Sequence, residues 1–93
     1  MKLKFDPTKS ERNQRERDLP FERAHDFDFE TAIIYTDERF DYPEPRFIAI
    51  GYLENRLHVL VFAEERDSLR VIRFRKANER EAEKFGLPQK RYQ

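Results

Sequence analysis

The chain has 93 residues, which is the size of one domain and leaves no room for a second. It contains no cysteine, so disulfides, thiol nucleophiles and thiolate metal sites are excluded. Its 19 basic and 19 acidic residues cancel to a net charge of zero, and a charged fraction of 41% against an apolar fraction of 38% predicts a small core with a large wet surface, or an obligate complex.

The first third of the chain predicts a short strand followed by two helices. Residues 2–5 form the strand, and a polar helix then begins with Asp6 as its cap and Pro7 in its first turn. This helix ends near Arg17, because Pro20 disfavours helical geometry in the residue before it. Pro20 opens a second, short helix whose apolar side chains share one face: Phe21, Ala24 and Phe27.

From Thr31 onward the hydrophobic pattern is typical of strands. Four runs are rich in β-branched, aromatic or leucine side chains: residues 31–36, 46–53, 56–64 and 68–74. Tight connections at 54–55 and 65–67 predict that the last three runs form an antiparallel meander. Residues 59–62 are apolar on both faces, so the sheet needs cover on both sides, with helices on one face and a partner on the other.

The chain closes with a third predicted helix. Asn78 with Glu81 three residues later is a capping-box pattern, which predicts a helix to about Phe85 that ends at Gly86. The predicted fold is therefore one α+β domain over residues 1–93, in the order β-α-α-β-β-β-β-α, with a small antiparallel sheet and helices packed on one face. No apolar run is long enough for a signal core or a membrane span, so we expect a cytoplasmic protein without membrane contact.

The zero net charge conceals a strong asymmetry along the chain. Residues 68–93 carry eight Lys or Arg against three Glu, a net +5, whereas residues 1–67 carry eleven basic against sixteen acidic residues, a net −5. Within the acidic part, residues 26–44 hold seven acidic residues and the single base Arg39. Such asymmetry indicates a basic surface for a polyanion, although the charges could also solvate unrelated surfaces. The centre of this surface is Arg70, Arg73, Arg75 and Lys76.

Four stretches, in order along the chain, carry a recognisable pattern. They are Phe5-Asp6-Pro7-Thr8-Lys9; the positions Asn13, Arg17, Asp18, Leu19, Phe21, Glu22 and Ala24; Asp41 through Gly51; and Leu60 through Ala77, including Glu64, Asp67, Arg70, Arg75 and Lys76. Together they resemble the BrnT family, the toxin halves of bacterial type II toxin–antitoxin pairs. The resemblance implies a RelE-like fold, ribonuclease activity that inhibits translation, and inhibition by a cognate BrnA-like antitoxin in a hetero-oligomer.

Cleavage of RNA at its own 2′-hydroxyl needs a group that removes a proton, cations that stabilise the phosphorane, and protonation of the leaving 5′-oxygen. Arg70 and Arg75 are the first choices for the phosphate, because a guanidinium stays charged and offers a fork of donors. Glu64 is the carboxylate chosen as general base, since the hairpin at 65–67 brings it towards Arg70. Further residues are predicted to bind RNA: Arg73, Lys76, Arg46, Arg17 and Tyr42.

A structural reading of the same residues stays open. Strict strand alternation from Leu69 places Arg73 and Arg75 on one face of the sheet and Arg70 and Lys76 on the other, unless the strand twists or bulges. Glu64 could be a plain cross-strand partner of Arg70 or Arg66. Tyr42 could pack at the entry of a strand, with Arg46 paired to Glu44 or Asp41.

Two histidines typical of the family are missing from this sequence. The family's Lys-His-Gly is Glu16-Arg17-Asp18 here, and Phe40 replaces a histidine ahead of the Asp-Tyr pair. Arginine cannot act as a base at physiological pH, so a second hypothesis is a catalytically weakened homologue that binds RNA or an antitoxin. A third is a small regulatory domain that binds a protein.

The remaining motifs point away from a metal or a nucleotide cofactor. His25 and His58 are interpreted as structural or surface residues, because they do not have metal-ligand spacing. The carboxylates between residues 26 and 44 form no calcium loop, and the chain has no glycine-rich phosphate loop. We therefore expect no metal and no cofactor.

Overall fold

The computed structural model describes residues 2–92 and contains the eight predicted elements in the predicted order. They are β1 (Lys2–Lys4), α1 (Pro7–Arg17), the 3₁₀-helix η1 (Phe21–Asp26), β2 (Ile33–Thr36), β3 (Phe47–Leu53), β4 (Arg56–Glu65), β5 (Ser68–Lys76) and α2 (Glu79–Phe85). The α+β class is confirmed. The RelE-like character that the resemblance implies stays a prediction.

The ends of the helices are set by the local chemistry that the sequence indicates. The carboxylate of Asp6 accepts a hydrogen bond from the Thr8 backbone N–H at 2.9 Å, with Pro7 in the first turn of α1. Both halves of the predicted capping box form at α2, where Asn78 and Glu81 each accept from the other's backbone N–H. Gly86 ends α2 at φ 66°, a left-handed conformation that glycine adopts without strain.

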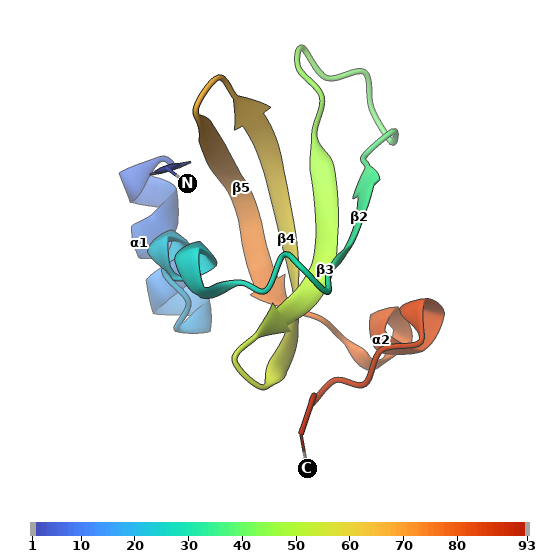
Figure 1. The fold of residues 1–93 in the computed structure, drawn as a ribbon. Coiled ribbons are helices and arrows are strands. Elements are labelled where there is room, and N and C mark those ends of the chain that lie inside the picture. Colours follow the sequence, from blue (N-terminus) through green and yellow to red (C-terminus); the bar gives the residue numbers. More distant parts are fainter. Residues whose placement is uncertain (1, 93) are drawn as a thin grey trace.

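The sheet is mixed, so the prediction of an antiparallel sheet is wrong at one edge. Its strand order is β1-β5-β4-β3-β2, and Figure 1 shows β5 and β2 on opposite sides. Strand β1 pairs in parallel with β5, with Leu3 opposite Leu69, whereas the other neighbours are antiparallel. Because β1 meets β5 across more than sixty residues of chain, no turn signal could reveal that pairing.

Helices cover both faces of the sheet, which corrects the prediction of helices on one face. The first, here called the η1 face, buries Leu60, Phe62 and Phe74 against η1. The second, the α2 face, buries Ile48, Ile50, Val59 and Val61 together with Ala82 of α2. This architecture explains why β4 is apolar on both sides.

Helix α1 lies on the β5 side of the sheet (Figure 1). It is polar nearly all round, and Ser10 is its one buried residue. The side-chain amide of Asn13 donates to the carbonyl oxygens of Leu19, at 2.7 Å, and Phe74, at 2.9 Å. Asn13 therefore fastens a basic helix to β5, beyond the short stretch that pairs with β1.

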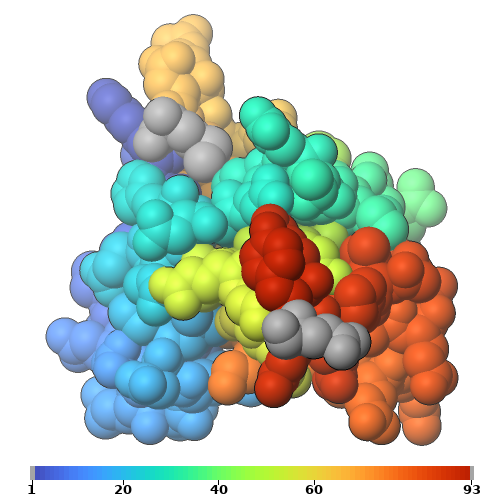
Figure 2. Space-filling view, turned by 60° about the horizontal axis from the view of Figure 1, so that its bottom comes forward, coloured from blue at the N-terminus to red at the C-terminus, as the bar shows by residue number. Residues whose placement is uncertain are grey.

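The segment after α2 folds back onto the β3–β4 hairpin. Figure 2 shows this segment, in red, lying against the yellow-green hairpin. The Leu57 N–H donates to the Gln89 carbonyl at 2.8 Å, the Arg91 N–H donates to the Asn55 carbonyl at 3.0 Å, and the Tyr52 hydroxyl donates to the Pro88 carbonyl at 2.7 Å. These bonds fix the position of α2 over its face of the sheet.

Candidate functional site

A β-bulge in β5 gathers three arginines on one face. Val61 pairs with Arg73 and Phe62 pairs with Val71, so Ile72 is the extra residue. Because residues opposite one another in a ladder share a face, Arg73 and Arg75 lie with Val61 and Val59 on the α2 face. Arg70, opposite Ala63, lies on that same face.

The same register confirms one predicted placement and corrects another. Lys76 pairs with His58 and lies on the η1 face, opposite Arg73 and Arg75 as strict alternation predicts. Glu64 pairs with Leu69 and also lies on the η1 face, so it does not approach Arg70. The carboxylate beside Arg70 belongs to Glu65, at 2.6 Å from the guanidinium, because β4 extends one residue further than predicted.

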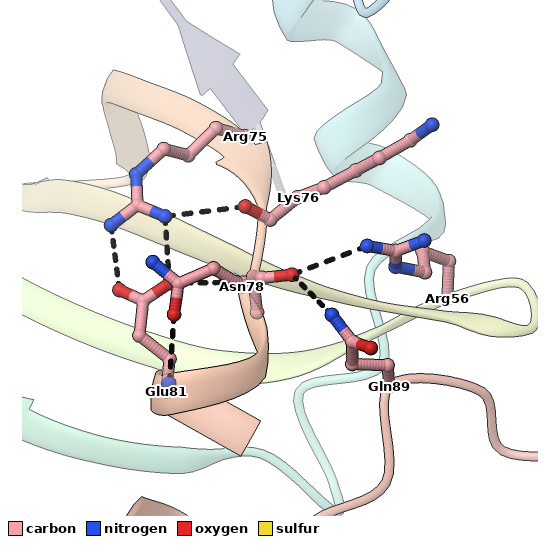
Figure 3. Close-up of polar contacts among 7 residues, drawn as sticks. Arg56, Arg75, Lys76, Asn78, Glu81 and Gln89 are labelled. Carbon is pink, nitrogen blue, oxygen red and sulfur yellow. Dashed lines mark hydrogen bonds and ion pairs between the residues drawn. The ribbon is translucent and has the colours of Figure 1, made fainter. Parts of the chain in front are cut away.

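Two of the arginines are already paired with carboxylates. Arg75 forms a two-pronged ion pair with Glu81, with hydrogen bonds of 2.8 and 2.7 Å, as Figure 3 shows. Those hydrogen bonds raise the pKa of Arg75, although burial of the guanidinium opposes the shift. Arg70 binds Glu65, which also lies 3.4 Å from the ammonium of Lys4.

Arg46 differs from Arg70 and Arg75, because its guanidinium contacts an aromatic ring instead of a carboxylate. Its guanidinium stacks on the ring of Tyr42, with 4.2 Å between the carbon Cζ and the ring centroid. Its Nε atom is buried without a hydrogen-bond partner among residues 2–92, and within that range it forms no ion pair. The structure therefore stacks Arg46 on Tyr42 instead of pairing it with Glu44 or Asp41.

Asp37 fixes the position of the Tyr42 ring on which Arg46 stacks. The buried carboxylate of Asp37 accepts the Tyr42 hydroxyl at 3.0 Å and two hydrogen bonds of 2.8 Å from the Arg39 side chain. The hydrogen bonds from Arg39 are the main reason that the pKa of Asp37 lies far below its usual value. Asp37 thus positions Arg46 through Tyr42.

Replacing Asp37 with Asn is expected to lower the free energy of unfolding at pH 7 by about 2 kcal/mol, because charge-assisted hydrogen bonds are lost. The folded-state pKa of Asp37 lies below the unfolded value, so this stability is complete above about pH 5 and declines as the pH falls below about 4. Urea denaturation of both proteins at pH 7 and pH 3 measures the gap. A gap that widens toward pH 3 would contradict the assignment.

Two adjoining grooves meet at Arg46. One, of about 710 Å³, runs past Lys4, Lys9 and Arg70. The other, of about 420 Å³, lies between α1 and β5. We call this second one the basic groove; the cations that line it are Lys9, Arg12, Arg17, Arg46, Arg73 and Arg75.

The basic groove is rich in cations that no carboxylate neutralises. Within residues 2–92, Arg75 is the only one of its six cations that forms an ion pair. Glu16 is the one acidic residue in the lining. Such a surplus of positive charge in a concave surface attracts and concentrates polyanions.

The structure sorts the sequence-based site residues by position. Four of them line the basic groove: Arg17, Arg46, Arg73 and Arg75. Tyr42 lies beside the groove, and its ring stacks on the guanidinium of Arg46. Lys9 and Arg12 were missed, because they lie in a helix of mixed charge. Helical spacing is the signal that could have found them, since residues 9, 12, 13, 16 and 17 recur along one side of α1.

Neither histidine lies in the basic groove. His58 is buried on the η1 face, where its Nδ1 is 2.8 Å from the Arg56 carbonyl, and burial lowers its pKa. His25 is exposed on η1. Across residues 2–92, no three His, Asp or Glu side chains are grouped as metal ligands, and no helix is long and apolar enough to cross a membrane.

One of two comparisons with known proteins finds a match, and it covers most of the chain. A search of curated proteins finds no match. A family model described as the ribonuclease toxin BrnT of type II toxin–antitoxin systems matches residues 5–81, which include α1, the sheet from β2 to β5 and the arginines of the basic groove. The family's activity is that of a ribonuclease, and its members have an antitoxin as partner. The chain belongs to the BrnT family of ribonuclease toxins.

Proposed function

We propose that this protein, as a single toxin domain, binds RNA in the basic groove, cleaves it without a metal ion and thereby inhibits translation until its antitoxin binds. The observation that carries the proposal is Arg46, a partly buried guanidinium without a carboxylate at the junction of two grooves. A buried N–H group that lacks an acceptor, such as the Nε of Arg46, is costly to the folded protein. A phosphate would satisfy it, with Tyr42 keeping the guanidinium in place.

In the proposed complex, the RNA backbone follows the groove between α1 and β5. Lys9, Arg12 and Arg17 contact neighbouring phosphates, while Arg46 and Arg73 hold the phosphate that reacts. Their donors stabilise the negative charge of the phosphorane more strongly than that of the ground-state phosphate, which is what accelerates the reaction. Arg70 and Arg75 lie beside them, already paired with carboxylates.

Glu65 takes the role of general base in this proposal, in place of Glu64. Arg70 and Lys4 hold its carboxylate on the face that carries the arginines. From there it can accept the proton of the attacking 2′-hydroxyl. As the 2′-oxygen bonds to phosphorus, the bond from phosphorus to the 5′-oxygen breaks. The leaving 5′-oxygen takes a proton from water, and Glu65 returns its proton to the solvent, because the arginines remain cations throughout and cannot donate one.

Replacing Arg46 with Ala is expected to weaken the binding of single-stranded RNA roughly 30-fold, which corresponds to about 2 kcal/mol for a charge-assisted contact. The stability of the protein should hold or rise, because the variant removes a buried polar atom without a partner. Fluorescence anisotropy with a labelled oligonucleotide measures the affinity, and thermal denaturation measures the stability.

Arg15→Ala is the matched control for Arg46→Ala. It also removes one arginine, but Arg15 lies on the side of α1 that faces away from the basic groove. RNA affinity should change little, apart from the general effect of one charge. Equal losses in the two variants would show that net charge, and not the groove, binds the RNA.

A second candidate function is RNA binding with little cleavage. The absence of histidine from the basic groove favours it, because histidine is the side chain best suited to proton transfer near neutral pH. This candidate keeps the same groove and the same Arg46 contact. It differs only in the chemical step.

The proposal also covers the partner of the protein and the compartment in which it acts. We infer that the partner is a BrnA-like antitoxin that forms a hetero-oligomer with this chain, and that both act in the cytoplasm. Family membership supports the antitoxin as partner.

A further inference from the structure

The two edges of the sheet are protected very differently. At one edge, β1 is only three residues long and carries Lys2 and Lys4, while α1 lies beside the rest of β5. At the other edge, every residue of β2 is exposed, and its sequence Ile33-Ile34-Tyr35-Thr36 contains no charge and no proline. Natural proteins usually place charge, proline or a covering element at an edge, because an open edge pairs with other strands.

Exposed apolar surface concentrates around β2. Within residues 2–92 five large hydrophobic side chains are exposed, and four of them come from residues 33–40: Ile33, Ile34, Tyr35 and Phe40. Phe40 is 69% exposed and Ile34 is 45% exposed. A cluster of this kind on an otherwise polar surface marks a contact with another protein.

The charges around β2 select the kind of partner. Glu30 precedes β2 and Glu38 follows it, and the segment of residues 26–44 carries seven acidic residues against one arginine. If two copies of the chain paired through β2 in antiparallel fashion, the Glu30 end of each would lie near the Glu38 end of the other. Like charges opposed in this way are unfavourable, so a partner with basic flanks fits better than a second copy.

We propose that β2 is the docking edge for an extended segment of the antitoxin, which adds a sixth strand to the sheet. Main-chain hydrogen bonds to β2 would supply affinity, and flanking Lys or Arg would meet Glu30 and Glu38. Successive apolar side chains of the segment, one on each face of the sheet, would cover Ile34 and Tyr35. The inference rests on the proposed function, because it takes the antitoxin as the partner. Strand β2 and β5 lie at different places in the sheet order, and no residue of β2 lines the basic groove, so the segment docked at β2 does not itself occupy the groove.

The test uses the full chain and its cognate antitoxin, purified separately. Ile34→Lys places a cation against the proposed basic segment and should weaken antitoxin binding roughly 100-fold by calorimetry. RNA affinity should stay unchanged. Arg12→Glu is the matched control, because it alters the basic groove and should weaken RNA binding without affecting the docking of a segment at β2.

Hydrogen exchange gives a second readout that needs no variant. The amide hydrogens of residues 33–36 should become protected when the wild-type chain binds the antitoxin. Unchanged exchange there, or unchanged affinity of Ile34→Lys, would overturn the proposal. So would the finding that Ile34→Lys abolishes self-association of the chain instead. If wild-type chain fails to bind RNA while β2 amides are protected by the antitoxin, the docking edge stands and the proposed groove function fails.

Discussion

Replacing Glu65 with Gln is expected to slow RNA cleavage by roughly 10²–10⁴-fold, the range typical of a lost general base. The carboxylate lies beside Arg70 and Lys4 on the face that carries the arginines, and an amide cannot accept the proton of the 2′-hydroxyl. RNA binding should change far less than the rate. Single-turnover cleavage at saturating protein separates the two effects.

Glu64→Gln is the matched control, because it makes the same chemical change one residue earlier. Glu64 lies on the opposite face of the sheet, opposite Leu69, and its replacement should leave the rate within about twofold. The reverse outcome, with Glu64→Gln slow and Glu65→Gln normal, would restore the residue that the sequence alone favours. Equal rates in wild type and both variants would remove these carboxylates from the mechanism.

Phe74→Ala should have the largest effect on stability, lowering the free energy of unfolding by about 3–5 kcal/mol. Phe74 is 1% exposed, and its ring packs against Phe27, at 6.2 Å between centroids, and His58, at 5.5 Å. Since domains of this size are stable by only about 5–15 kcal/mol, the variant should be close to unfolding at 37 °C.

Urea denaturation of Phe74→Ala against Phe40→Ala measures this effect. Phe40 is 69% exposed, so its replacement should change the free energy of unfolding by no more than about 0.5 kcal/mol. The midpoint of the Phe74 variant should shift strongly while the dependence on urea concentration stays similar. Similar midpoints for the two variants would show that the core is not organised around Phe74.

The elements of this fold could be predicted because their signals are local. Asp6 with Pro7 and Asn78 with Glu81 each place a helix start within four residues, and the turn at Glu54 and Asn55 fixes the register of β3 against β4. The parallel pairing of β1 with β5 has no such signal. It depends on where a three-residue strand fits in the finished sheet.

The basic surface was predicted from composition, but its arrangement was not. One inserted residue, Ile72, moves Arg70 to the face of Arg73 and Arg75, and a β4 one residue longer than expected puts Glu65 where Glu64 was predicted to act. Because side chains alternate with a period of two, a shift of a single residue reverses each assignment.

Whether an arginine is free to bind a phosphate depends on the tertiary structure. The sequence favours Arg75 as a phosphate ligand, yet in the fold its guanidinium is bound by Glu81. The sequence offers Glu44 or Asp41 as a partner for Arg46, yet in the fold Arg46 stacks on Tyr42 and forms no ion pair within residues 2–92. Pairings of this kind depend on side-chain geometry that spacing along the chain does not encode.

The most direct test of the proposed chemistry is cleavage of a labelled RNA oligonucleotide by the purified chain in EDTA, beside the same oligonucleotide with one 2′-deoxynucleotide at the cleaved position. We expect cleavage of the RNA that leaves a 2′,3′-cyclic phosphate, and no cleavage at the 2′-deoxy position although the oligonucleotide still binds. Cleavage that stops in EDTA, or that persists at the 2′-deoxy position, would contradict a metal-independent attack by the 2′-hydroxyl. Binding without any cleavage would leave the second candidate, an RNA-binding homologue, in its place.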